Sequence, residues 1–320
     1  MEVEMTIQKQ RDSNIELLRI VAMFSVLLIH IDFLALGFPT VNDIRTNTFD
    51  AILRVFFQSL TVSCVDIFVF ISGWFGIKPR LKGLCSYLFQ CFFFLFGLYM
   101  VTLALGYSSL SVSGFLGCIA ATNVNWFIKA YLLLYILSPI LNAFVSNTSR
   151  KDFRSVLILF YLFQFLYGWI FKSATAFIQD GYSTISFIGL YLLARYLYIY
   201  KPNICAWRTR RLLSMAFFLI FIITILYVVP PLSGYMNTIA LGNTFLSYIS
   251  PTTIFITACV VISFSKLRIQ SSIVNLLAKS SFAVFLFHTN PNLSSYYLSF
   301  FNELHDVVTP LGYWIVSFPV

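Results

Sequence analysis

Residues 14–33, NIELLRIVAMFSVLLIHIDF, are apolar enough to enter a lipid bilayer, yet this segment carries four ionisable side chains. They are Glu16, Arg19, His30 and Asp32. Because charged groups inside a membrane segment are costly, such residues indicate functional sites by default.

The spacing of these residues predicts a shared face. Arg19 and His30 are 11 positions apart, which on an α-helix places them ~20° from the same direction and ~16 Å apart along the axis. Glu16 precedes Arg19 by three positions, the spacing of an ion pair. We therefore expect a guanidinium and an imidazole to face the same protein interior. The alternative is that Glu16 and Arg19 anchor the helix at the interface and His30 is a packed polar group of the bundle.

The composition predicts an all-α polytopic membrane protein. The chain has 320 residues, of which 59% are hydrophobic and 10% charged, whereas a soluble domain has about 25% charged residues. We expect one membrane domain over residues 1–320 without a soluble appendage, and ten transmembrane spans: 15–37, 54–76, 83–107, 126–146, 154–171, 183–200, 211–229, 250–265, 273–290 and 307–320. Residues 108–122 and 230–249 are apolar but interrupted, and we interpret them as re-entrant or surface segments. The last span is short for a crossing.

Lysine and arginine gather in every second loop, which predicts a cytoplasmic N-terminus by the positive-inside rule. The net charge of +9 then reflects topology and not nucleic-acid binding. The residues concerned are Lys9, Arg11, Lys78, Arg80, Lys82, Arg150, Lys151, Arg154, Lys201, Arg208, Arg210, Arg211, Lys266 and Arg268. The first ten residues lack the apolar core of a signal peptide, so we expect the first span to remain in the mature protein.

Metal and nucleotide-hydrolysis motifs are not found in the sequence. The six cysteines have no spacing typical of zinc ligands. No phosphate-binding glycine loop or serine-nucleophile elbow occurs. We therefore expect no metal and no bound cofactor.

The second span contains a carboxyl group and a pair of small residues. Asp66 either forms a structural ion pair, with Arg54 or another cation, or takes part in the chemistry. Ser72 and Gly73 are small enough for another helix to approach closely, and helix packing alone would explain them as well.

Later spans add further candidates. Trp126 marks the outer interface, and Lys129 is interpreted as reaching outward along its apolar stem in preference to contacting a substrate. Arg195 either reaches the cytoplasmic surface or contacts a phosphate-bearing cofactor. His288 is a candidate partner for His30 or for an acceptor. His305 is expected to be solvated in an outer loop.

These residue types indicate one site that is reached from both sides of the membrane, by a phosphate-bearing donor from the inside and by a hydroxyl acceptor from the outside. Burial favours the neutral form of an imidazole, and a neutral imidazole is a general base for a hydroxyl group. A guanidinium such as that of Arg19 suits a phosphate or pyrophosphate.

Four blocks of the sequence resemble the acyltransferase 3 family of membrane proteins. They are NIELLRIVAMFSVLLIH with Arg19 and His30, VDIFVFISGWF with Ser72, NWFIKAYLLLYILSPIL with Trp126, and KSSFAVFLFHTNP with His288. Their order and spacing agree over nearly the whole chain. Trp74, where tyrosine is commoner, and Lys129 depart from the pattern.

The resemblance implies a multi-pass enzyme of the bacterial inner membrane that moves an acyl group, commonly acetyl from acetyl-CoA, to a hydroxyl of an extracytoplasmic glycan. Arg19 and His30, with Glu16 at the preceding acidic position, would be the functional residues. His30 would be a base or a transient acyl carrier. The expected partners are acyl-CoA, a lipid-linked or polymeric glycan and the bilayer, with no nucleic acid. One alternative is a polysaccharide exporter without covalent chemistry, which the intramembrane charges of Arg19, Asp66, Lys129 and Arg195 would serve. The other is a membrane scaffold, which the number of ionisable groups at membrane depth disfavours.

Overall fold

The computed structural model describes residues 12–119, 125–234 and 239–318, and every regular element in these ranges is a helix. Six helical segments are long and apolar enough to cross a membrane: α1 with the π-helix η1 (Ser13–Leu34), α3 with α4 (Thr48–Phe75), α5 (Leu81–Ala104), α7 (Trp126–Asn147), α8 with η2 (Arg150–Ile170) and α11 (Thr209–Leu232). Three shorter apolar helices join them: α9 (Thr184–Tyr200), α13 (Pro251–Ser265) and α14 (Ser272–His288). The expected class, an all-α polytopic membrane protein, is confirmed.

Short helices connect these elements. They are α2 (Val41–Thr46), α6 (Val112–Ile119), η3 (Ala174–Ala176), η4 (Gln179–Gly181), α10 (Asn203–Ala206), α12 (Ala240–Phe245), α15 (Ser294–Val307) and α16 (Pro310–Ser317). The helix α6 falls within the apolar stretch 108–122, and α12 falls within 230–249. Positions 120–122 and 235–238 of those stretches lie outside the described residues.

The tenth expected span differs from the structure. In place of a crossing over 307–320, the chain forms α15 and then α16, which has eight residues. Eight residues rise ~12 Å, far less than the ~30 Å core of a bilayer. The count of ten spans therefore remains a prediction.

The second expected span is broken into two helices. The segment α3 (Thr48–Thr61) ends one turn before α4 (Cys64–Phe75) begins, and Val62 and Ser63 lie between them. Asp66 consequently lies in the first turn of α4 and not in the middle of a continuous helix.

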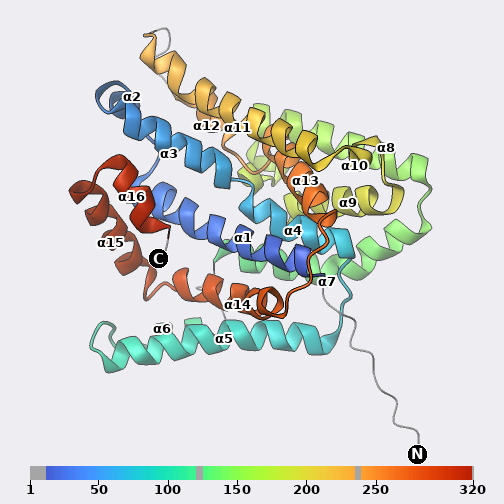
Figure 1. Ribbon diagram of the computed structural model, residues 1–320. Coiled ribbons are helices and arrows are strands. Elements are labelled where there is room, and N and C mark those ends of the chain that lie inside the picture. The colour runs from blue at the N-terminus through green and yellow to red at the C-terminus, as the bar shows by residue number, and fades with distance from the viewer. Residues whose placement is uncertain (1–11, 120–124, 235–238, 319–320) are drawn as a thin grey trace, which may run out of the picture.

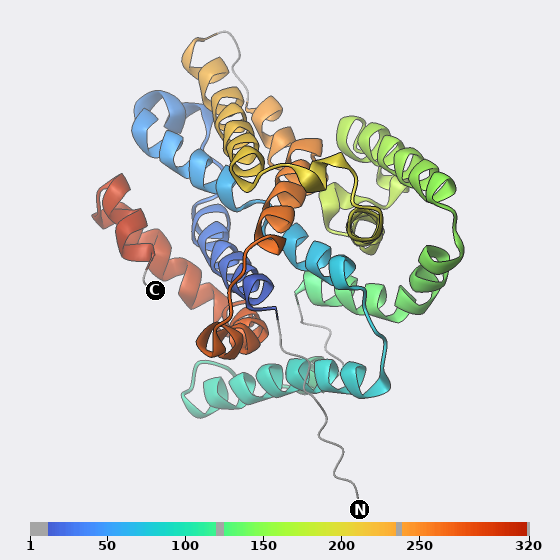
Figure 2. The ribbon, with the colours of Figure 1, turned by 45° about the vertical axis from the view of Figure 1, so that its right-hand side comes forward.

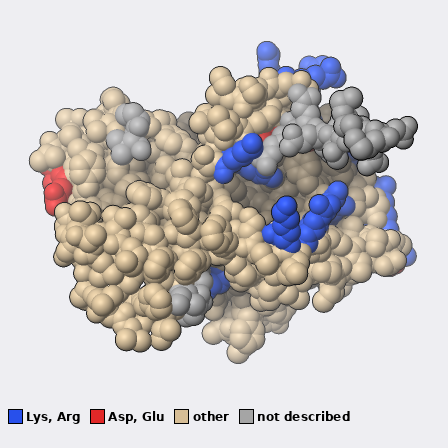
Figure 3. All heavy atoms as spheres, turned by 90° about the horizontal axis from the view of Figure 1, so that it is seen from below, with Lys and Arg blue, Asp and Glu red and all other residues tan. Residues whose placement is uncertain are grey.

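The basic loops gather at the end of the bundle where α1 begins. Arg150 lies over the Tyr200 ring, and the Lys266 ammonium donates to the Trp207 carbonyl, so three of these loops contact one another. The backbone N–H of residue 271 donates to the Ser13 side chain at the start of α1. Figure 3 shows lysine and arginine atoms around a hollow towards this end, which is the right-hand side in Figure 1. This arrangement agrees with the alternation of charge along the sequence.

The helices α1 and α4 lie in the middle of the bundle (Figures 1 and 2). The helix α1 packs against α14, α4, α3 and α13, while α4 packs against α9. Gly73 permits the contact with α9, because a Cβ atom at this position would lie 2.5 Å from the Tyr191 carbonyl oxygen. The small residue at Gly73 therefore has a packing role, and its neighbour Ser72 faces a cavity.

Candidate active site

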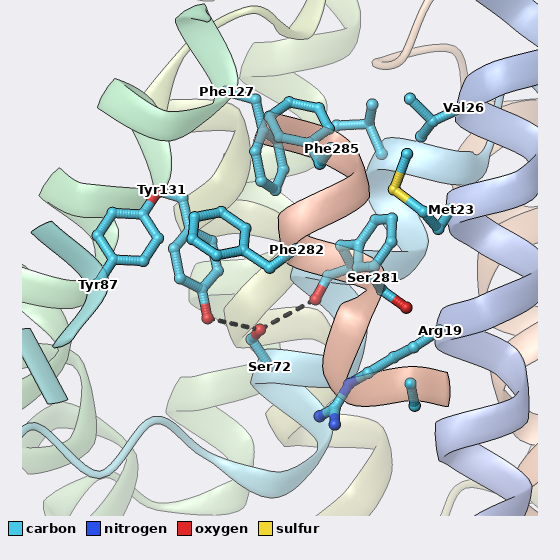
Figure 4. A pocket seen from close by; sticks show the side chains of 13 residues that line it. Arg19, Met23, Val26, Ser72, Tyr87, Phe127, Tyr131, Ser281, Phe282 and Phe285 are labelled. Atoms are coloured by element: carbon cyan, nitrogen blue, oxygen red, sulfur yellow. Dashed lines mark hydrogen bonds between the residues drawn. The ribbon is translucent and has the colours of Figure 1, made fainter. Parts of the chain in front are cut away.

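A cavity of about 270 Å³ lies between α1, α4, α5, α7 and α14 (Figure 4). Its walls have a polar end and an apolar end. The lining residues are Arg19, Met23, Val26, Val65, Phe68, Ser72, Tyr87, Phe127, Tyr131, Ala278, Ser281, Phe282 and Phe285.

The polar end is built around Arg19. Its Nη1 donates to Glu16 Oε1 at 2.6 Å, so the buried carboxylate one turn earlier holds the guanidinium in place. In Figure 4, Arg19 extends from α1 towards Ser72 on α4. The Ser72 hydroxyl donates to the Phe68 carbonyl, so the 2.9 Å contact with Tyr131 is donated by the tyrosine hydroxyl. A cation and two fixed hydroxyl groups therefore face the same space, which suits an anionic, hydrogen-bonding ligand.

The apolar end is closed by side chains from three helices. Val26 on α1, Phe127 on α7 and Phe285 on α14 lie opposite Arg19 and Ser72 in Figure 4. The ring centroids of Phe127 and Phe285 are 5.4 Å apart. This end can hold an apolar group without offering it a polar contact.

A pair of histidines lies beyond the apolar end. His30 Nδ1 and His288 Nε2 are 2.9 Å apart, and His288 Nδ1 is 2.9 Å from the carbonyl oxygen of Val284. As the spacing predicts, Arg19 and His30 both face α14.

The carbonyl of Val284 determines the proton positions of the neutral pair. A carbonyl oxygen only accepts, so His288 carries its proton on Nδ1 and its Nε2 has a free lone pair. That lone pair accepts the Nδ1 proton of His30. The Nε2 of His30 is then the unprotonated nitrogen, which is the arrangement of a general base oriented by a second group.

His30 and Asp32 both lie in a π-helical turn that follows α1. The chain turns from α-helix to π-helix at η1 (His30–Leu34), and π-helical turns occur frequently at functional sites. Asp32 faces α3, where Arg54 Nε donates to its Oδ1 at 2.8 Å and Arg54 Nη2 donates to the Gly37 carbonyl at 2.7 Å. Both charged side chains are buried. The pair therefore fixes the segment that carries His30.

The cavity and the histidine pair are adjacent but not continuous. Neither His30 nor His288 lines the cavity, whereas Phe285 does. The Phe285 ring lies 5.6 Å from the His288 ring, centroid to centroid. The expected passage from Arg19 to His30 is therefore interrupted by an aromatic wall.

Asp66 lies apart from both sites. Of the alternatives that the sequence left open for Asp66, the ion pair with Arg54 is not formed, because Arg54 pairs with Asp32. Asp66 is buried on the side of α4 away from the cavity, and its Oδ2 has no hydrogen-bond partner among the described residues. The cavity is reached instead by Val65 and Phe68 of the same helix.

Trp126 and Lys129 do not line the cavity either. Trp126 begins α7 and packs in an aromatic cluster, with its ring centroid 4.5 Å from Tyr182 and 6.0 Å from Tyr248. Lys129 is exposed. The residue between them that does reach the cavity is Phe127.

Arg195 supports the wall of a second cavity at the end where α1 begins. Its Nη1 donates to the Trp74 carbonyl at 3.2 Å, and its guanidinium lies 5.6 Å from the centre of the Tyr198 ring. Trp74, Tyr198 and Arg268 line this cavity of about 670 Å³. Arg195 is therefore half-buried and held by these two contacts.

The sequence predicted that His305 is solvated in an outer loop, and this prediction is wrong. It lies on α15, is partly buried, and its Nε2 is 3.3 Å from Asp50 Oδ1. The outer segments thus have packed polar contacts of their own.

Several cavity residues were not predicted as site residues. On α14 they are Ala278, Ser281, Phe282 and Phe285. They share one helical face with His288, which was predicted, so their spacing from His288 could have identified this face. Tyr87 had no such signal, because the few polar residues of α5 do not mark one face of the helix. Among the described residues, no group of three or more His, Cys, Asp or Glu side chains is placed to hold a metal ion.

Comparison with known proteins identifies the family. Neither the curated proteins nor the solved structures that were compared contain a match to the chain. The family model described as an acyltransferase domain, that of acyltransferase 3, matches residues 12–320 and so includes Arg19, the cavity and both histidines. The chain therefore belongs to the acyltransferase 3 family of membrane acyltransferases.

Proposed function

We propose that this protein transfers an acyl group, acetyl in the first instance, from acyl-CoA to a hydroxyl group of a glycan across the bacterial inner membrane. The observation that carries the proposal is the placement of Arg19 and the His30–His288 pair along the same two helices, on either side of one cavity. The acceptor would be a surface polysaccharide or its lipid-linked unit.

Arg19 would bind the donor. The side of the bundle where α1 begins carries the basic loops and is taken as the cytoplasmic side. The Arg19 guanidinium, held by Glu16, matches the phosphates of acyl-CoA. The hydroxyls of Ser72 and Tyr131 suit the amide groups in the arm of acyl-CoA that connects the phosphates to the thioester. The cavity lined by Arg268, Trp74 and Tyr198 offers space at the same end for a planar base and its phosphates.

His30 would act as the general base. The acceptor hydroxyl gives its proton to His30 Nε2 while its oxygen attacks the thioester carbonyl carbon. The carbon–sulfur bond breaks, and the thiolate takes the proton from His30. The products are an ester and a free thiol, so atoms and charge balance. His288 would hold the imidazole and accept a hydrogen bond from the imidazolium that forms.

The test is the acetyl content of the surface polysaccharide in cells that carry His30→Ala. We expect O-acetylation to fall by ~10²-fold or more, the contribution typical of a general base, while the protein still inserts in the membrane. His305→Ala is the matched control, because it removes the third histidine of the chain, which contacts Asp50 and belongs neither to the cavity nor to the His30–His288 pair. Full acetylation in the His30→Ala cells contradicts the proposal.

The same measurement separates transfer from export. An exporter mutant would keep polysaccharide inside the cell with unchanged acetyl content per repeat. The charges that motivate this alternative are Arg19, Asp66, Lys129 and Arg195. Arg19 pairs with Glu16 and Arg195 donates to the Trp74 carbonyl, whereas Asp66 lines neither cavity and Lys129 is exposed. They do not form a polar path through the bundle, so transfer is the better supported function.

A further inference from the structure

Phe285 occupies the boundary between the cavity and the histidine pair. It lies on α14, one turn after Ser281, which lines the cavity, and one turn before His288. Its ring contacts Phe127 on one side, at 5.4 Å between centroids, and His288 on the other, at 5.6 Å. The residue is 8% exposed, so the ring is shielded from the protein surface while it lines the cavity.

Val26 completes this boundary from the facing helix. It lines the cavity, and His30 follows it by one helical turn on α1. A group that approaches His30 from the Arg19 end therefore meets Val26 and Phe285 immediately before it meets the histidines. Val26 is small and 2% exposed, so the bulk of the boundary belongs to the phenylalanine ring.

We propose that Phe285 limits the size of the acyl group that this enzyme transfers. The inference rests on the proposed function. When the hydroxyl attacks, the thioester carbonyl lies beside His30. The acyl chain attached to it then lies next to the His288 ring, which the Phe285 ring contacts at 5.6 Å between centroids. The acyl chain of an acetyl group is a single methyl, which needs little space beside the histidines. A longer acyl chain would need volume that the Phe285 ring occupies. A closely packed interior resists the insertion of additional methylene groups.

The experiment compares two donors in membranes that contain the full chain and the acceptor polysaccharide. Acetyl-CoA and butanoyl-CoA are supplied separately, thiol release is followed with time, and the acylated polysaccharide is measured by mass spectrometry. The quantity of interest is the ratio of kcat/KM for butanoyl-CoA to that for acetyl-CoA. One methylene in an apolar site changes such a ratio by about 10–200-fold. We therefore expect Phe285→Ala to raise the ratio at least ~10-fold.

Phe282→Ala is the matched control. Phe282 lines the same cavity, but its ring stacks on Tyr87 at 5.1 Å. Its loss lowers donor binding for both substrates and leaves the ratio unchanged. A purely structural effect of Phe285→Ala lowers both rates equally, which distinguishes it from a change of selectivity.

An unchanged ratio in an active Phe285→Ala enzyme overturns the inference while leaving the proposed function intact. If that variant does not accumulate, Phe285→Leu is measured in its place, with a smaller shift expected in the same direction and an unchanged ratio again contradicting it. If the wild-type protein uses neither donor, the proposed function fails and the inference fails with it.

Discussion

At the scale of single residues, the account depends on which nitrogen of His30 is free to take a proton. The sequence placed His30 and Arg19 on one face and named His288 as a possible partner. It could not show that His288 Nδ1 meets the carbonyl of Val284, because that contact depends on the ring orientation within α14. This hydrogen bond is what leaves the His30 Nε2 lone pair available.

His288 is therefore predicted to be a positioning residue. In His288→Gln the amide oxygen can still accept the His30 Nδ1 proton, and we expect measurable transferase activity. In His288→Leu no acceptor remains, so the free nitrogen of His30 is no longer specified, and we expect a loss of ~10²-fold or more in kcat. The measurement is kcat per molecule of inserted protein in isolated membranes.

A role in packing alone predicts the opposite order. Leucine fills an apolar space better than glutamine, so a merely structural histidine would tolerate leucine and reject glutamine. Equal kcat values for His288→Leu and the wild type would contradict the assignment.

At the scale of elements, the most informative departure from expectation is the end of the first helix. The residues His30–Leu34 form a π-helical turn, in which His30 contacts His288 of α14 and Asp32 contacts Arg54 of α3. Helical periodicity assumes a constant angle per residue, so it could predict the shared face of Arg19 and His30 but not the change of geometry that follows. The break between α3 and α4 was also missed, because no proline or glycine marks Val62 and Ser63 within the apolar run.

The buried pair at this turn is predicted to be essential to the fold of the site. Arg54→Met leaves the carboxylate of Asp32 buried without its partner, and breaking a buried pair in this way costs about 3–5 kcal/mol. We expect the free energy of unfolding of the detergent-solubilised protein to fall by that amount. The double variant Asp32→Leu with Arg54→Met removes both charges and should be more stable than Arg54→Met alone. A double variant as unstable as the sum of the two single variants would exclude this coupling.

At the scale of the whole molecule, the class and the charge asymmetry were predictable from the sequence. Apolar runs and basic loops are averages over many residues, so a single error does not change them. The last span was not predicted as the structure has it. The chain there forms the amphipathic helix α15 and the short helix α16, and hydropathy alone does not separate these two helices from a membrane span. The cavity depends on side chains of five helices, and no pattern along one segment reveals such a convergence.

The central claim is the proposal that the acyl group is transferred between the two sides of the membrane, from the cavity at Arg19 past the boundary formed by Val26 and Phe285 to the nitrogen of His30. The direct measurement uses sealed proteoliposomes with labelled acetyl-CoA on the side where α1 begins and the acceptor polysaccharide, identified from the His30→Ala comparison, only on the opposite side. The account predicts labelled polysaccharide with the wild-type protein and none with His30→Ala. Acetylation that requires donor and acceptor on the same side of the membrane would contradict it.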